Sequence, residues 1–216
     1  MSGLVATLYL KPRQHRFKDK RARQISDPTK AILGKNKLDV VSCKSSIYPY
    51  FISNVASNLF QGFLMIWWGW LAFNTASNYS VSRYQWTEGM RSAVGTIMAS
   101  AGGGTVTVLI SRWTTKKIQV DMLIDGMLAS LVSSTAGCLF FTPWQATLVG
   151  AIGSAMALLI YPLLEKAQID DPVGVVPVHV VGSVWGMISP AIFVCRDFGL
   201  EDHQVSSHVV EISSLK

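Results

Sequence analysis

Five stretches of this sequence are each long enough and apolar enough to cross a lipid bilayer as a helix, which needs about 20 apolar residues. They carry almost no charge and cover Tyr48–Asn74, Ala93–Ile110, Met122–Phe141, Trp144–Leu164 and Val173–Val194. Because the hydrocarbon core holds no water, each backbone N–H and C=O has to be satisfied within the segment, and open β-strands cannot achieve this. The sequence therefore predicts an all-α, polytopic helical bundle in a membrane.

The composition favours the same class. Half of the 216 residues are hydrophobic and only 15% are charged, so a soluble domain of this size would struggle to cover its surface with polar groups. The alternative is a large soluble all-α protein, but its helices would usually carry one apolar stripe instead of being apolar all round. We therefore predict an integral membrane protein.

The positive charge is concentrated in one segment. Eleven of the nineteen Lys and Arg residues lie between Lys11 and Lys44, and by the positive-inside rule this loop is cytoplasmic. Alternating the five spans from there puts fifteen of the nineteen inside and four outside. We predict a basic cytoplasmic loop over 11–47 and a polar tail over 196–216 outside. Such a loop could also bind anionic lipid or RNA, but a topology signal accounts for it without a nucleic-acid partner.

The first ten residues are a short apolar piece without a basic region before it, so they do not read as a cleavable signal peptide. We interpret 1–10 as the remnant of a transmembrane helix. The three cysteines, Cys43, Cys138 and Cys195, are spaced like neither zinc ligands nor a redox pair. We expect Cys43 to be a cytoplasmic free thiol, the other two to be packing residues, and the protein to need neither metal nor cofactor.

Small residues gather within three of the spans. The run Gly102-Gly103-Gly104 lowers helix propensity but allows another backbone to approach closely. Further small residues fall near one face of the next two spans: Gly126, Ser130, Ser134, Gly137, Gly150, Gly153 and Ser154. We expect them to form helix–helix contacts, with a pore-lining role for the serines as the alternative.

His179 is the only histidine within an apolar span, and an ionisable residue at membrane depth is a candidate functional residue. Gly182 and Gly186, three and seven positions on, should lie under the same helix face and let a neighbouring helix crowd the imidazole. Pro177 should kink the helix beside it, and the Asp170-Asp171-Pro172 sequence should cap its start. The alternative is a histidine that only packs against a neighbouring helix.

The first span carries Trp70, Phe73 and Ser77 at spacings of three and four. This spacing puts two aromatic rings and a hydroxyl on one stripe. Such a stripe can hold a small cation through the ring faces and a hydroxyl oxygen. An aromatic belt at the membrane interface is the alternative.

These residues stand in motifs that resemble the ammonium transporter family. The matching strings are GWLAFNTAS (Gly69–Ser77), Gly126 through TAGC (Thr135–Cys138), Pro143-Trp144, and DDPVG (Asp170–Gly174) through His179 and Trp185-Gly186. The resemblance extends over nearly the whole chain. It is closer to the ammonium transporter branch than to the Rhesus-type branch of the superfamily.

The resemblance implies an eleven-helix channel protomer with an inverted repeat, assembled as a homotrimer in the plasma membrane. This chain would supply the end of the fifth helix and then helices six to ten, with a partial transporter domain over 48–195. The implied pathway residues are Ser77 at an outer ammonium site beside Trp70, Phe73 as a gate, and His179 as one of a hydrogen-bonded histidine pair. Asp171, Gly182 and Gly186 would support the pore helix.

The chain also departs from the family pattern. Ala76 stands where glycine is usual, Asp125 where asparagine is usual, and Pro177 and Val180 flank His179 where small residues are common. The second histidine of the pair and the other recruitment aromatics belong to helices one to five, which are not in this sequence.

Two function hypotheses follow. The first is transmembrane transport of ammonium or ammonia by a fragment or truncated form of a transporter. The second is a non-conducting structural or modulatory subunit that assembles with full-length protomers. We do not expect an enzyme, because His179 has no nucleophile, metal set or acid partner nearby in sequence.

Overall fold

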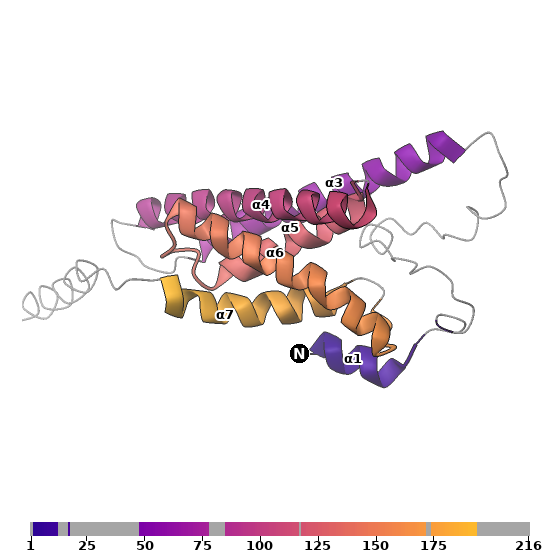
Figure 1. Cartoon of the computed structure of the whole chain (residues 1–216). Helices are drawn as coiled ribbons and strands as arrows, with labels where there is room; N and C mark the ends of the chain where they lie inside the picture. The colour runs from indigo at the N-terminus through magenta and orange to yellow at the C-terminus, as the bar shows by residue number, and fades with distance from the viewer. Residues whose placement is uncertain are drawn as a thin grey trace, which may run out of the picture.

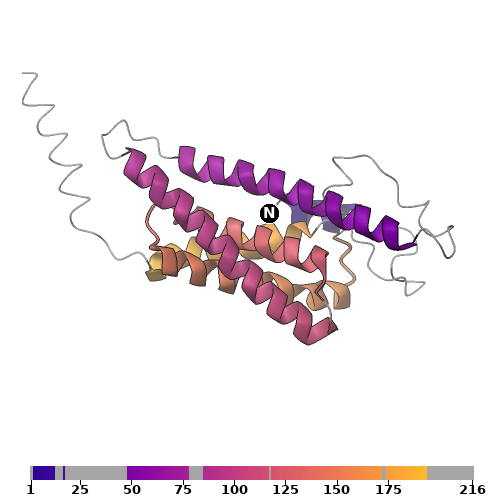
Figure 2. The ribbon, with the colours of Figure 1, turned by 90° about the horizontal axis from the view of Figure 1, so that it is seen from above.

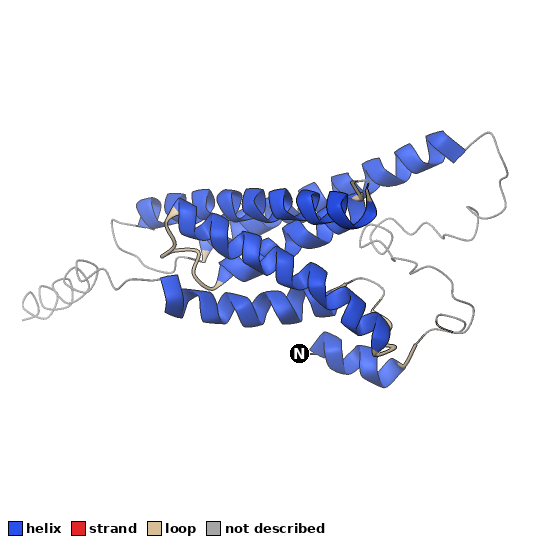
Figure 3. Ribbon diagram, viewed as in Figure 1, coloured by secondary structure: helices blue, strands red, loops and turns tan. Residues whose placement is uncertain are grey.

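The computed structural model describes residues 2–12, 17, 48–77, 85–116, 118–171 and 174–193, without the side chains of 48–59 and 85. Its elements are α1 (Ser2–Leu10), α3 (Tyr48–Ala76), α4 (Gln85–Thr115), α5 (Val120–Thr135), α6 (Pro143–Lys166), the π-helical turn η2 (Val176–Val181) and α7 (Gly182–Phe193). All the described elements are helical (Figure 3). The all-α prediction is therefore confirmed.

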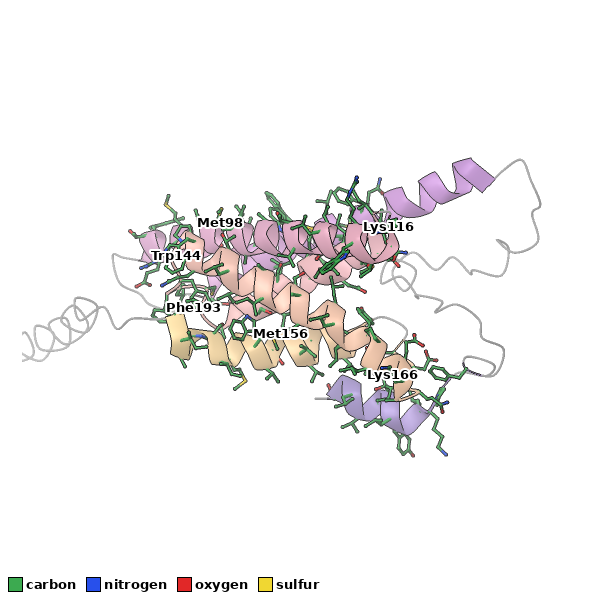
Figure 4. All side chains as sticks on the ribbon, in the orientation of Figure 1. Met98, Lys116, Trp144, Met156, Lys166 and Phe193 are labelled. Carbon is green, nitrogen blue, oxygen red and sulfur yellow. The ribbon has the colours of Figure 1, made fainter. Side chains whose placement is uncertain are left out.

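The long helices run side by side along one axis (Figure 1), and seen from above α3 and α4 are close at one end and diverge toward the other (Figure 2). Trp144 and Phe193 lie at one end of the bundle, and Lys116 and Lys166 lie at the other (Figure 4). Helix α4 ends at the same end of the bundle at which α5 begins, and α6 likewise ends there before η2 and α7. Successive helices are therefore antiparallel, as short connections between them require. The first turns of α3 extend past the end at which α4 finishes (Figures 1 and 2).

Three of the described helices are long and apolar enough to cross a membrane: Trp86–Thr115, Pro143–Lys166 and Val176–Phe193. The 29-residue α3 covers a fourth predicted span. The fifth, predicted over Met122–Phe141, is only 16 residues long in α5. After Thr135 the chain continues as turns: the Cys138 N–H bonds the Thr135 carbonyl at 3.4 Å and the Phe140 N–H bonds the Gly137 carbonyl at 2.9 Å, each to the third residue before it.

The short helix α5 lies at the centre of the bundle. Its buried residues Ile124, Leu128, Ala129 and Leu131 form one apolar cluster with Phe63 of α3, Ala157 of α6 and Val178 of η2. A second cluster joins Ala99 of α4 to Phe141, Ala146 and Val149. Every other long described helix packs on α5, so α5 is the support on which the remaining helices are arranged.

Glycines and hydroxyls fill the helix contacts, as expected from their spacing. A Cβ on Gly150 would meet the carbonyl oxygen of Ala99 and lie 2.8 Å from its carbonyl carbon, and one on Gly103 would lie 2.7 Å from Ser130 Oγ. Thr107 Oγ1 and Ser154 Oγ are 2.7 Å apart between α4 and α6. Ser130, Ser134 and Ser154 are fully buried, so the structure places them in helix packing, the way membrane helices associate.

Candidate substrate pathway

The side chain of His179 is exposed and lies in η2, the turn that leads into α7. Single π-turns within helices are rare and occur often at functional sites. Pro177 is buried at the start of this turn, where its missing N–H removes one bond from the ladder. The kink predicted at Pro177 therefore takes the form of a local π-turn.

Asp171 holds the start of this segment. Its Oδ2 accepts a hydrogen bond of 2.6 Å from the backbone N–H of Val176, and its side chain is 6% exposed. A carboxylate at this position satisfies a donor that the helix itself leaves unpaired and interacts favourably with the helix dipole. Asp171 Oδ1 has no hydrogen-bond partner.

Gly182 and Gly186 are buried against α5. A Cβ on Gly186 would lie 2.9 Å from the carbonyl oxygen of Ser133, and one on Gly182 would lie 3.3 Å from that of Ala129. The imidazole of His179 is instead exposed, so the expectation that a helix on the glycine face would crowd it is wrong for α5. The reason is the π-turn, which has more residues per turn than an α-helix and so rotates His179 away from the glycine face.

The three residues of the predicted stripe on α3 point to different environments. Trp70 is half-buried, and its indole N–H donates to Thr135 Oγ1 of α5 at 2.9 Å. Phe73 is 58% exposed. The Ser77 hydroxyl donates to the carbonyl of Phe73 at 2.7 Å, which leaves its oxygen able to accept from a cation such as ammonium.

The structure does not bring Phe73 and His179 together. Helix α3 contacts α4 and α5, whereas η2 contacts α1, α5, α6 and α7. The elements that carry the two candidate groups therefore do not pack directly on each other, although α5 contacts both. The two groups are exposed where further protein would have to cover them to form an enclosed pathway.

Sequence reasoning missed several polar contacts that position these helices. Trp67 Nε1 donates to Ser100 Oγ at 3.1 Å, and Asn74 Nδ2 donates to Thr96 Oγ1 at 3.0 Å. The Tyr161 hydroxyl donates to Asp125 Oδ2. The sequence did contain a signal for these contacts: Asn74 and Asp125 place an amide and a carboxyl within apolar spans, and such groups need a partner on another helix. In the described ranges, no three or more His, Cys, Asp or Glu residues are grouped to hold a metal ion.

Comparison with known proteins decides the family. The profile of the Ammonium Transporter Family matches residues 51–213. The chain belongs to the ammonium transporter family. It is 66% identical over 196 residues to "Putative ammonium transporter 2" of Caenorhabditis elegans, which covers 91% of this chain and 33% of that protein.

More distant members of the ammonium transporter family agree. "Ammonium transporter Amt2" of Archaeoglobus fulgidus is 34% identical over 139 residues, 64% of this chain and 29% of that one. Among solved structures, "Sensor Amt Protein" superimposes with a TM-score of 0.61 at 31% identity, over 66% of this chain and 35% of its own. The crystal structure of Candida albicans Mep2 gives 0.59 at 26%, over 65% and 30%.

The bundle is thus part of the Amt and Mep transporter fold, which confirms the fold prediction. The chain spans about a third of the length of the curated ammonium transporter that it matches at 66% identity. Every residue of the predicted site, from Trp70 to Gly186, falls within the matched region.

Proposed function

We propose that this chain forms part of a transporter that moves ammonium or ammonia across a membrane, with His179 lining the route. The observation that carries the proposal is the exposed imidazole on a π-turn within an apolar span. The described helices do not cover this side chain, so it lies on a surface that the rest of an inverted-repeat transporter would adjoin. An ionisable side chain there is placed to contact a substrate that passes between the two halves.

Physical chemistry constrains how the substrate crosses. Taking a bare ammonium ion into hydrocarbon is prohibitive, whereas neutral ammonia needs little stabilisation. Selectivity therefore follows from recruiting the cation at the outer end, removing a proton, passing ammonia and returning the proton inside. Ser77 offers an acceptor oxygen for the cation and the exposed ring of Phe73 forms the gate. His179 carries protons, because an imidazole exchanges them near neutral pH.

The test uses the complete transporter, by which we mean this sequence together with the remaining helices of the eleven that the family resemblance implies. Expressed in a host lacking its own ammonium transporters, the complete transporter should restore growth on limiting ammonium. A complete transporter that reaches the membrane but gives no growth and no ammonium uptake would refute the proposed function.

We propose further that the protein lies in the plasma membrane as a homotrimer, or in assembly with full-length protomers, with 11–47 in the cytoplasm and 196–216 outside. Lys116 and Lys166 lie at the same end of the bundle (Figure 4). This supports the proposed orientation, because the positive-inside rule puts both lysines at the inner surface.

The orientation predicts how cysteines react in intact cells. A variant keeping only Cys43 should be protected from an impermeant thiol reagent, and one keeping only Cys195 should be labelled. Both lie outside the described residues. Both variants also carry Cys138→Ala, so that no other thiol can contribute to the labelling signal. Cys138 is buried, so this replacement does not change the protein surface. Ready labelling of the Cys43 variant, with protection of the Cys195 variant, would reverse the orientation.

A further inference from the structure

A hydrogen-bonded pair joins α5 to α6 beside the segment that carries His179. The Tyr161 hydroxyl of α6 donates to Asp125 Oδ2 of α5. Asp125 is only 6% exposed, and burying a carboxyl group is costly unless it is hydrogen-bonded. The transport mechanism proposed above gives this pair no role.

Gly174 lies directly against this pair. Its φ of +68° is a conformation that side-chain-bearing residues rarely adopt. A Cβ here would lie 3.4 Å from Asp125 Oδ2 and 3.5 Å from Oδ1, and would also meet the Tyr161 hydroxyl. The position therefore requires glycine both for its backbone angle and for its closeness to the pair.

The same glycine begins the helix on which His179 stands. The Gly174 carbonyl accepts a hydrogen bond of 3.0 Å from the N–H of Val178, and two residues further on Val176 N–H bonds Asp171 Oδ2 at 2.6 Å. These two bonds define where η2 starts. A shift of Gly174 would therefore move the whole turn and change the direction of the imidazole.

We propose that Asp125 and Tyr161 are positioning residues for His179. The pair holds Gly174 in place, Gly174 fixes the start of η2, and η2 presents the imidazole to the pathway. This inference rests on the proposed function. The bond from Tyr161 needs an acceptor oxygen at position 125, and an asparagine carbonyl would accept the same bond.

The experiment compares substitutions in the complete transporter. Tyr161→Phe removes the donor and Asp125→Ala removes the acceptor, and each should lower the selectivity for ammonium over potassium and the uptake rate. A fall of roughly tenfold is expected, since small misplacements of a functional group by remote changes can cost up to about a hundredfold. Asp125→Asn keeps an acceptor and should retain most of the uptake.

Matched controls lie elsewhere in the described chain. Tyr9→Phe removes a hydroxyl from a side chain that is 83% exposed, and Asp121→Asn changes a carboxyl one turn before Asp125. Gly174→Ala should reproduce the loss caused by Tyr161→Phe, whereas Gly69→Ala adds a Cβ that meets nothing within 4 Å. In a His179→Ala background, Tyr161→Phe should change neither the remaining ammonium uptake nor the potassium flux any further, because the pair acts through His179.

A second measurement does not depend on transport. In a His179→Cys variant, adding Tyr161→Phe should change the rate of thiol modification at position 179 several-fold, while adding Tyr9→Phe should not. If uptake by the unsubstituted complete transporter is absent, the proposed function fails and this rate still decides the positioning role. Unchanged modification rate, or unchanged selectivity per folded molecule in Tyr161→Phe and Asp125→Ala, would overturn the inference.

Discussion

Replacing His179 by alanine in the complete transporter should abolish ammonium uptake or remove its discrimination against potassium. The described helices leave the imidazole exposed on η2, so the substitution should leave the packing of these helices intact and remove the chemistry of the ring. Membrane insertion should be unaffected, because taking a polar group out of an apolar span eases insertion. Uptake of labelled methylammonium, potassium flux and the amount of protein in the membrane are the three measurements.

The control is His15→Ala. His15 lies in the predicted basic loop, outside the described residues, where water would satisfy an imidazole. This variant should transport as well as the unsubstituted protein. Normal transport by His179→Ala, with unchanged discrimination against potassium, would show that His179 is not part of the pathway and that the route lies elsewhere.

The 216-residue chain expressed by itself should give no ammonium uptake. Its described helices leave His179 exposed and Phe73 58% exposed, so these helices do not enclose a route past both residues. In transporters built from inverted repeats the pathway lies between the two halves. Growth of a transporter-deficient host on limiting ammonium, with the complete transporter as the positive control, measures this.

Restored growth with the chain alone would mean that these residues form a conducting pathway by themselves, and would contradict the prediction. Coexpression with full-length protomers separates the remaining alternative. A change in the uptake of those protomers, proportional to the amount of the short chain, would identify it as a modulatory subunit.

The helices could be predicted because hydropathy alone determines which segments enter a bilayer. The helix contacts of Gly103 and Gly150 followed from the same argument, since small residues mark where membrane helices meet. Hydropathy could not show that α5 is short. The residues after Thr135 remain mostly apolar, and the change there from helical bonds to turn bonds such as Cys138 N–H to the Thr135 carbonyl is not revealed by any periodicity.

The candidate site was predicted less completely, because spacing assigns residues to a face but does not name what covers that face. Trp70 shares a stripe with Phe73, yet its indole bonds Thr135 on α5 while Phe73 stays exposed. The kink at Pro177 was predictable, but its π-turn was not, and the direction of His179 depends on that turn. The Asp125–Tyr161 contact joins residues 36 positions apart, a distance over which a single sequence carries no pairing information.

The hydroxyl contacts of α4 have a consequence for biosynthesis. Thr107 of α4 contacts Ser154 of α6, which is synthesised 47 residues later. At roughly 5–20 residues per second, α4 is therefore in the membrane for a few seconds before its partner residue has been made. During this time the Thr107 hydroxyl can donate to the carbonyl of Gly103, at 2.8 Å within its own helix. Threonines that bond to their own backbone in this way let a helix leave the translocon alone and recruit its partner afterwards, without an unsatisfied donor in lipid.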